Sequence, residues 1–346
     1  MKKLLTLAAL LGLASCTVNF NPVNDSEVTL TVGVKSTRAE TKAETVAGTT
    51  DENKVNSIQV FVFKVNNGTY VFEAAARSAA SSVDITVTTG QKDVIILVNE
   101  PSDYVTTVTE RDVLLAKVSS LAQNSSSSYV MFGETTGEVS ATSHTIDVPV
   151  DRLASRVRIS KITNKLRNGN AGKNVKVSRV FLSNAGATVT YAAARNGFYA
   201  TAGINSKLDL NGTAVSGASE KASVNALIYK NINSDVIADE SSYSTPISLY
   251  AYPNDNAIKP TCLIVEMEIA GRFFTYPVEL PAMAANTTLE VSEMVITSIG
   301  NVSNGDDILD PGEDQPVEFQ ENTFSVTVKP WTVVPVATDT DGKYTI

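Results

Sequence analysis

The chain has 346 residues, a length that suggests two domains, and its hydrophobic share of 43% is enough to build real cores. Its formal net charge of −9 argues against nucleic acid and anionic membrane surfaces as partners. Of its two cysteines, one is assigned to a lipid below, so no disulfide framework is expected within one mature chain. The composition fits a surface protein better than an enzyme.

The first residues predict a lipoprotein export signal. Two lysines precede an apolar run over residues 4–13, and small residues then lead to Cys16. A charged start, a short apolar core and small residues before a cleavage point are typical of a secretory signal, and the run is too short to span a membrane. The cysteine at that point favours acylation of Cys16, with palmitate among the acyl chains, over an ordinary signal peptide that ends near a chance cysteine.

Residues 27–35 predict a single strand, in which Val28, Leu30, Val32 and Val34 share one face. Residues 36–45 are polar, and exposed polar segments are where proteases cut. A regular strand followed by a protease-sensitive linker suggests that the strand is removed by proteolysis. The alternative is a first strand followed by a long loop.

The rest of the chain predicts an all-β body with one helix. Asn66-Asn67-Gly68 predicts a hairpin turn, and residues 110–118 predict a helix that Thr109 could cap. The first set of expected strands covers residues 58–65, 70–73, 83–87, 94–99, 129–132 and 145–150.

A second set of strands begins near residue 153. Arg152, Arg156 and Arg158 are expected to form a solvated strand face that pairs with acidic neighbours, in preference to a nucleic-acid site. Cys262 is expected to pack as a small buried hydrophobe. Ala270-Gly271 is expected to be a tight turn, and residues 185–244 are expected to carry long loops. The strands are expected at residues 175–182, 247–252, 263–269, 272–280, 289–299 and 324–329.

The C-terminal residues predict a strand and then a tail. Pro330 should end the strand, because proline cannot donate a ladder hydrogen bond. Two apolar pairs follow in the tail, Val334 with Val336 and Tyr344 with Ile346. A domain that was already closed would not need this tail; the alternative is a tail folded back on its own domain.

In their order along the chain, these features resemble the FimA-type fimbrillins, the lipoprotein-derived pilins of Bacteroidetes. The features are Cys16, the alternating strand, Arg38-Ala39, the acidic turn at 51–55 that leads into an apolar strand, the Arg-containing junction at 151–159 and the aromatic strand end at 249–254.

The resemblance implies two tandem transthyretin-like or Greek-key β-sandwich domains. It divides the chain into a signal peptide (1–16), a propeptide with the removable strand (17–38), an N-terminal domain (39–151), a C-terminal domain (152–331) and a donor tail (332–346). An arginine-specific protease would cut between Arg38 and Ala39. The tail of another subunit would then fill the vacated groove, and head-to-tail contacts of this kind give a filament.

The resemblance therefore implies a structural fimbrial subunit at the cell surface that supports adhesion. Its expected partners are other fimbrial subunits, the maturation protease and, through the precursor's lipid, the outer membrane, with no nucleic acid. Two alternatives stay open: a tip or accessory adhesin, and an uncut surface lipoprotein that binds glycans.

No catalytic, metal or cofactor site is expected. His144 is the only histidine and has no recognisable triad order around it, and no Cys/His set has zinc spacing. The acidic stretch 304–314 misses the EF-hand pattern, so a turn is favoured over a calcium site. Trp331 could stack on a sugar, but a core or groove-edge position is favoured.

Overall fold

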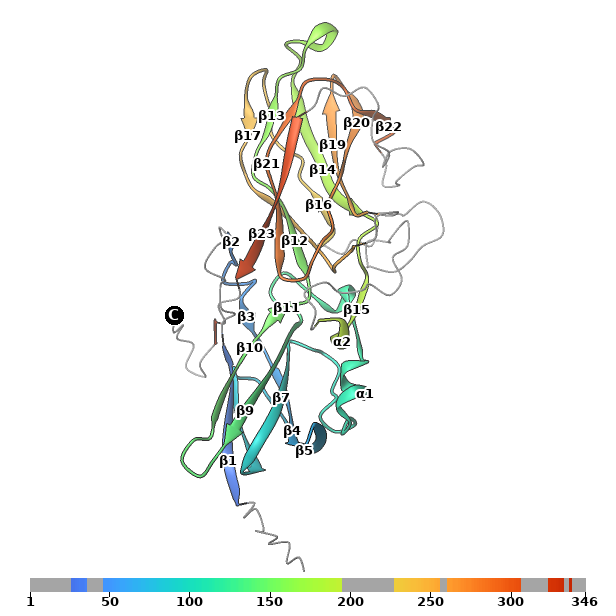
Figure 1. Ribbon diagram of the computed structural model, residues 1–346. Coiled ribbons are helices and arrows are strands. Elements are labelled where there is room, and N and C mark those ends of the chain that lie inside the picture. The colour runs from blue at the N-terminus through green and yellow to red at the C-terminus, as the bar shows by residue number, and fades with distance from the viewer. Residues whose placement is uncertain are drawn as a thin grey trace, which may run out of the picture.

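The computed structural model describes residues 26–35, 46–194, 227–255, 260–305, 323–332 and 336–337. Its sheets form two units stacked along one axis, with most strands up to β11 in the first unit and most strands from β12 onward in the second (Figure 1). Helices are few and short, which confirms the all-β class with minor helix.

Two sheets form the first unit, with strand orders β10-β1-β6 and β11-β9-β7-β4-β5. Apolar side chains between them form one core cluster, to which Leu30, Val60 and Ile96 belong. The strands are β1 (Glu27–Lys35), β4 (Ile58–Asn66), β5 (Thr69–Ser78), β6 (Ser82–Thr88), β7 (Gly90–Val98), β9 (Met131–Val139), β10 (Thr145–Pro149) and β11 (Asp151–Arg152). Three short strands lie outside these sheets: β2 (Val46–Ala47), β3 (Lys54–Val55) and β8 (Val118–Ser120).

Strand β4, which lies between β7 and β5, is apolar on both faces because both faces are covered. Val60 and Val62 belong to the cluster that also contains β1 side chains. Phe61 and Phe63 alternate with them and belong to a larger cluster that continues into the second unit. A strand buried on both faces has a nearly continuous apolar run, which is the pattern of residues 58–63.

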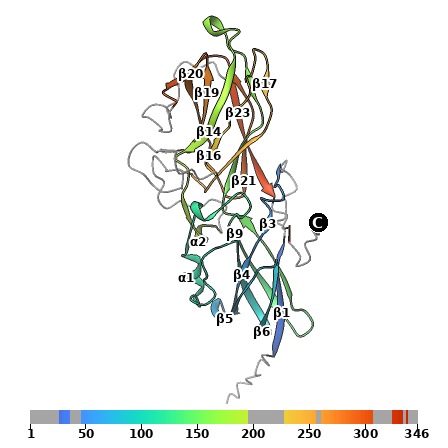
Figure 2. The same cartoon turned by 180° about the vertical axis from the view of Figure 1, so that it is seen from behind.

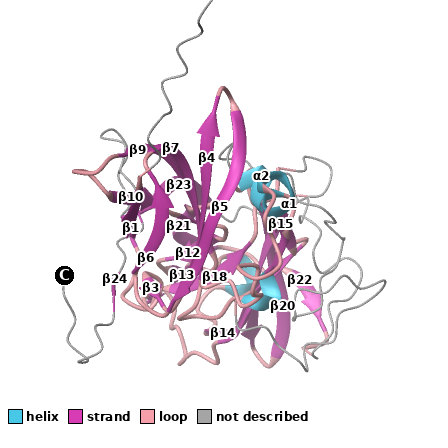
Figure 3. Cartoon of the chain, turned by 90° about the horizontal axis from the view of Figure 1, so that it is seen from below, coloured by secondary structure: helices cyan, strands magenta, loops and turns pink. Residues whose placement is uncertain are grey.

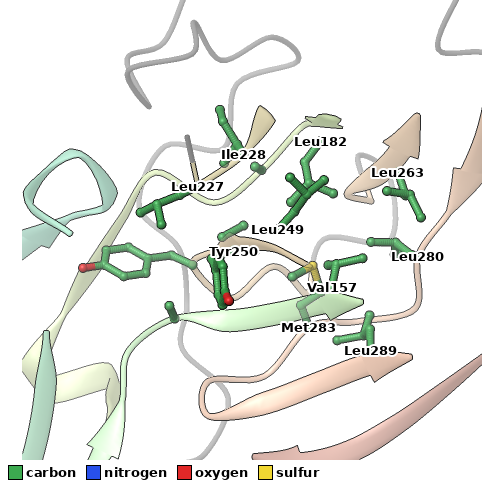
Figure 4. Packing of buried hydrophobic residues seen from close by; sticks show 14 of the residues in the cluster. Val157, Leu182, Leu227, Ile228, Leu249, Tyr250, Leu263, Leu280, Met283 and Leu289 are labelled. Carbon is green, nitrogen blue, oxygen red and sulfur yellow. The ribbon is translucent and has the colours of Figure 1, made fainter. Parts of the chain in front are cut away.

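The second unit also consists of two sheets. One has the order β17-β13-β21-β12-β18, with β23 on β21, and the other has the order β16-β14-β19-β20-β22. Figure 4 shows Val157 and Leu289 of the first sheet packed with Leu182 and Leu263 of the second. The strands are β12 (Ser155–Ile159), β13 (Ile162–Asn164), β14 (Val175–Ser183), β16 (Tyr229–Asn231), β17 (Ser242–Tyr243), β18 (Ile247–Ala251), β19 (Cys262–Ile269), β20 (Arg272–Glu279), β21 (Thr287–Ile296), β22 (Asn301–Ser303) and β23 (Thr323–Thr332).

The two units are joined by backbone pairing as well as by the chain itself. β15 (Thr188–Thr190) pairs with β8 of the first unit. The short helices α1 (Arg111–Leu115) and α2 (Tyr191–Ala194), one from each unit, contact each other. They lie together beside the strands in the view from behind and in the view from below (Figures 2 and 3). Two 3-10 turns, at Leu121–Gln123 and Asn168–Asn170, complete the described helical residues.

Both expected tight turns are confirmed. Asn67 and Gly68 have φ of 48° and 79°, the positive values that a two-residue hairpin loop requires. Ala270 and Gly271 have φ of 51° and 75° between β19 and β20. Cys262 is a buried free cysteine, as expected.

Two local expectations are wrong. The helix expected at 110–118 covers only Arg111–Leu115, and Thr109 does not cap it, because Glu110 is the N-cap. Val118 instead begins β8, since pairing with β15 overrides the helical period. Pro330 does not end its strand: β23 continues to Thr332. Proline is tolerated on edge strands, and β23 has β21 on one side and only the two residues of β2 on the other.

The end of β10 packs closely against Gly133 of β9. A Cβ atom there would lie 2.3 Å from the carbonyl oxygen of Pro149 and 2.8 Å from Val150 Cγ1. We expect Gly133→Ala to destabilise the fold by about 1–3 kcal/mol in urea unfolding, because the clash involves backbone. Gly169→Ala is the control, since its Cβ would meet nothing within 4 Å. Equal unfolding midpoints for the two variants would contradict this placement.

Candidate functional site

The first strand of the chain is inserted between two others. β1 pairs antiparallel with β6, where Leu30 lies opposite Ile85, and parallel with β10, where Val34 lies opposite Val148. A strand with partners on both sides satisfies two rows of backbone groups at once. Its removal would therefore leave two unpaired strand edges, an arrangement that attracts a new strand.

The four alternating side chains of β1 are not equally buried. Leu30 and Val32 have no exposed surface. Val28 and Val34, at the two ends, are only partly buried against the same cluster. Full burial of a Val or Leu side chain contributes roughly 1.5–3 kcal/mol, so the two central residues supply most of the apolar contribution of β1. β1 is consequently most deeply buried at its centre.

Several predicted site residues lie outside the described residues. They are Cys16 before β1, Arg38 and Ala39 between β1 and β2, and Val334, Tyr344 and Ile346 in the tail. Val336 is described: Val336–Ala337 forms β24, which pairs parallel with β3 of the same chain. Nearby, β2 pairs parallel with the end of β23.

A buried charged cluster, here called the Glu52 centre, joins the turn before β4 to the second unit. It consists of Glu52, Arg152, Arg156 and Tyr250. Arg156 Nη1 lies 3.1 and 3.0 Å from the two carboxylate oxygens of Glu52, and the Tyr250 hydroxyl donates to Glu52 Oε1 at 2.5 Å. Arg152 Nε donates to the Glu52 carbonyl at 3.0 Å, and a second Arg152 nitrogen donates to Asn53.

Burial and charge oppose each other in this centre. Burial alone would raise the pKa of Glu52, but the hydrogen bond from Tyr250 and the positive charge of Arg156 bring the pKa below its ordinary value. Burial also lowers the pKa of Arg152 to about 10, although Glu52 acts in the opposite direction. The carboxylate is thus held in its charged form inside the protein.

The expectation of a solvated arginine face is therefore wrong for two of three residues. Arg152 is completely buried and Arg156 is 3% exposed, while Arg158 is half-buried and pairs with Glu290 at 3.0 Å. Pairing with acidic neighbours was expected. The burial of Arg152 and Arg156 was not expected, because it depends on the turn that carries Glu52 lying against them. The sequence signal for this centre was three arginines within residues 151–159 together with a carboxylate in the turn at 51–55.

Further polar contacts cross between the units. The Tyr191 hydroxyl donates to Glu100, and the Tyr252 hydroxyl lies 2.7 Å from Ser119 Oγ and 2.8 Å from Asn124 Nδ2. Burial raises the pKa of both tyrosines, so both hydroxyls stay neutral. These contacts place β1 and its groove in fixed relation to the sheet that carries β23.

No catalytic arrangement is evident in the part of the chain that the structure describes. His144 is exposed, and its Nδ1 lies 3.1 Å from the Ser140 carbonyl. Within those same residues, no group of three or more His, Cys, Asp or Glu side chains could hold a metal ion. None of the described helices is long and apolar enough to cross a membrane.

The comparisons with known proteins agree on one family and one fold. The profile of the family described as major fimbrial subunit protein (FimA) matches residues 26–250. A candidate cell adhesion protein from Bacteroides eggerthii has 16% identity and a TM-score of 0.63, over 90% of this chain and 98% of that one. A second candidate cell adhesion protein, from Parabacteroides distasonis, has 15% identity and a TM-score of 0.61, over 89% and 97%.

A fimbrilin from Porphyromonas gingivalis W83 has 12% identity and a TM-score of 0.55, over 89% of this chain and 98% of the fimbrilin. At these identities the likeness establishes the fold alone. No curated protein sequence matches this chain.

We expect Leu30→Ala to destabilise the uncut precursor by about 2–5 kcal/mol, because it empties the centre of the groove. Thr29→Ala is the control: Thr29 is exposed on the same strand and should change stability by less than about 0.5 kcal/mol. Urea unfolding measures both. If the two substitutions have equal effects, Leu30 does not anchor β1 in the way described.

Proposed function

The chain belongs to the FimA major fimbrial subunit family, and from this we propose that it is a subunit that polymerises by strand exchange. The family is one of fimbrial subunits, which places the protein at the cell surface. In our proposal the precursor is exported as a lipoprotein on Cys16 and cut between Arg38 and Ala39. β1 then leaves, and the tail of another subunit takes its place.

The observation that carries this proposal is the position of β1. It is the first described strand, it is paired on both sides, and its two central apolar side chains are fully buried. The three-residue step from Lys35 to Arg38 puts the proposed cut just beyond the end of β1. A cut there would separate β1 covalently from the sheets that it closes.

The tail offers what such a groove needs. Val334 and Val336 stand at alternating positions, as do Tyr344 and Ile346. Main-chain hydrogen bonds to β6 and β10 would give affinity, and alternate apolar side chains would give register. Because the donor and the groove are different surfaces of one chain, each joint leaves one groove and one tail free, and a filament grows.

We also propose the domain limits inferred above, with sandwich domains at 39–151 and 152–331 and the tail at 332–346. The expected partners are other fimbrial subunits and an arginine-specific protease. We propose that the protein has no enzymatic activity, because His144 has no catalytic partners within the described residues.

A tip or accessory adhesin is the second candidate, and one observation favours it. β24 of the tail pairs with β3 of the same chain, as expected of a subunit that accepts but does not donate. That pairing involves only two residues on each strand, in a chain whose groove is still filled by β1. We therefore prefer the polymerising subunit. An uncut glycan-binding lipoprotein has no specific observation in its favour.

We expect Arg38→Ala to leave an uncut lipoprotein that accumulates as a monomer, because β1 stays attached. N-terminal sequencing of the surface form measures this, with Ala39 expected as the first residue of the natural protein. Lys35→Ala and Lys42→Ala are matched controls that should be cut normally. A mature N-terminus at Cys16 or Thr17 in shed fibres would show that the proposal is wrong.

Deletion of residues 333–346 should leave both units folded but abolish chain growth, since β23 is kept and the donor is lost. Val336→Asp should act in the same way more weakly, because it would bury an unpaired charge in the partner's groove. Electron microscopy and sedimentation of cut protein measure growth. If the truncated protein still forms fibres, the tail is not the donor, and the tip or accessory adhesin becomes the preferred function.

A further inference from the structure

One segment of the first unit runs along the start of the proposed donor tail. We call residues 46–55, which include β2 and β3, the clasp. In β2, Val46 lies opposite Trp331 and Ala47 opposite Thr332. In β3, Lys54 lies opposite Val336 and Val55 opposite Ala337. Both pairings are parallel, so the clasp follows the chain across the point where β23 ends and the tail begins.

The middle of the clasp is a compact turn held by its own hydrogen bonds. The Thr49 amide donates to Glu52 Oε2 at 2.5 Å, and the Glu52 amide donates back to Thr49 Oγ1 at 3.2 Å. The Asn53 amide donates to the Thr49 carbonyl at 3.0 Å, and Asn53 Nδ2 donates to the Gly48 carbonyl at 3.2 Å. These bonds fix the direction in which β2 enters the turn and β3 leaves it.

The Glu52 centre attaches this turn to the second unit. Arg156 and Arg152 belong to β12 and β11, and Tyr250 belongs to β18, so the contacts come from strands outside the clasp. Glu52 is 3% exposed and Asn53 is 5% exposed, and water therefore competes little for these hydrogen bonds. None of these residues lies in β1, and all of them remain in the chain after a cut at Arg38.

We propose that the clasp holds the beginning of the donor tail against its own subunit, and that the Glu52 centre sets how firmly it holds. This inference rests on the proposed strand exchange, and adds a step to it. The tail must leave β3 before it can enter a neighbour's groove. In a precursor, β1 fills the groove of its own subunit. No groove is then open to the tail of a neighbour, and the tail stays on the clasp.

The strengths of the two sites favour release after the cut. The clasp offers the tail a two-residue pairing on β3, whereas the vacated groove offers two strand edges and the fully buried positions of Leu30 and Val32. The tail therefore binds the open groove more tightly than it binds the clasp. The clasp slows the transfer of the tail but does not prevent it. β2, at the end of β23, can stay paired while β3 releases the tail.

Cysteines at opposed positions test the clasp directly. Lys54→Cys and Val336→Cys are combined in a full-length precursor that also carries Cys16→Ser and Cys262→Ala, so that these are the only thiols. We expect an intramolecular disulfide in the uncut monomer, detected by gel mobility and by mass. Failure of this disulfide to form in protein with normal unfolding behaviour would overturn the inference.

Glu52→Gln tests the role of the centre. The amide keeps the shape of the side chain but loses the charge that Arg156 faces, and we expect the rate of disulfide formation to fall about tenfold. Tyr250→Phe removes the hydrogen bond to Glu52 Oε1 but keeps the charge of Glu52, and should lower the rate less. Glu266→Gln is the matched control: Glu266 is 1% exposed and pairs with Arg179 at 2.7 Å, on strands that pair with neither β2 nor β3. Equal rates for Glu52→Gln and Glu266→Gln would overturn the role of the centre.

Chain growth separates this inference from the proposed function. After cutting with an arginine-specific protease, the crosslinked double-cysteine protein should not polymerise, and reduction should restore growth. If strand exchange itself is wrong, no fibres form in either state although the disulfide does form. If fibres grow normally with the disulfide intact, the tail does not need to leave β3, and the clasp inference is wrong.

Discussion

The cost of an open sheet edge is the constraint on which the rest of this structure depends. β1 satisfies β6 on one side and β10 on the other, and Leu30 and Val32 close the core between the two sheets of the first unit. In the proposed function, a sandwich completed by its first strand keeps the precursor monomeric while that strand is present. The polar segment 36–45 follows this strand in the sequence. In the proposed strand exchange, one segment would therefore close the fold of the precursor and, once cut away, open it to assembly.

The second constraint is the cost of burying charge. Glu52, Arg152 and Arg156 are nearly inaccessible to solvent. Each of them forms hydrogen bonds or ion pairs that offset the free-energy cost of its desolvation. Buried ion pairs of this kind often add little net stability compared with apolar residues. Here they orient the turn at 49–53, because Glu52 is hydrogen-bonded to two strands of the second unit. That orientation places β2 and β3 beside the end of β23 and the start of the tail.

The third feature is the continuity between the two units. One apolar cluster extends from Phe61 and Leu97 in the first unit to Val157 and Leu249 in the second. The β8–β15 pairing and the Tyr191–Glu100 contact reinforce it. In the proposed strand exchange the groove lies in the first unit and the donor tail follows β23 of the second, so a filament of that kind would connect successive joints through this junction.

The sequence by itself determined β1 and the two tight turns, because their signals are local. Alternation predicted β1, and the Asn-Gly pair predicted the positive φ values at 67 and 68. The order of motifs along the chain also identified the family. Only the tertiary structure decided which faces are covered: that β1 sits between β6 and β10, and that Arg152 and Arg156 are buried against Glu52 about one hundred residues away. Long-range pairing also ended the helix early and carried β23 past Pro330. Burial depends on what packs against a strand, and that partner lies far away in the sequence, beyond the reach of a local pattern.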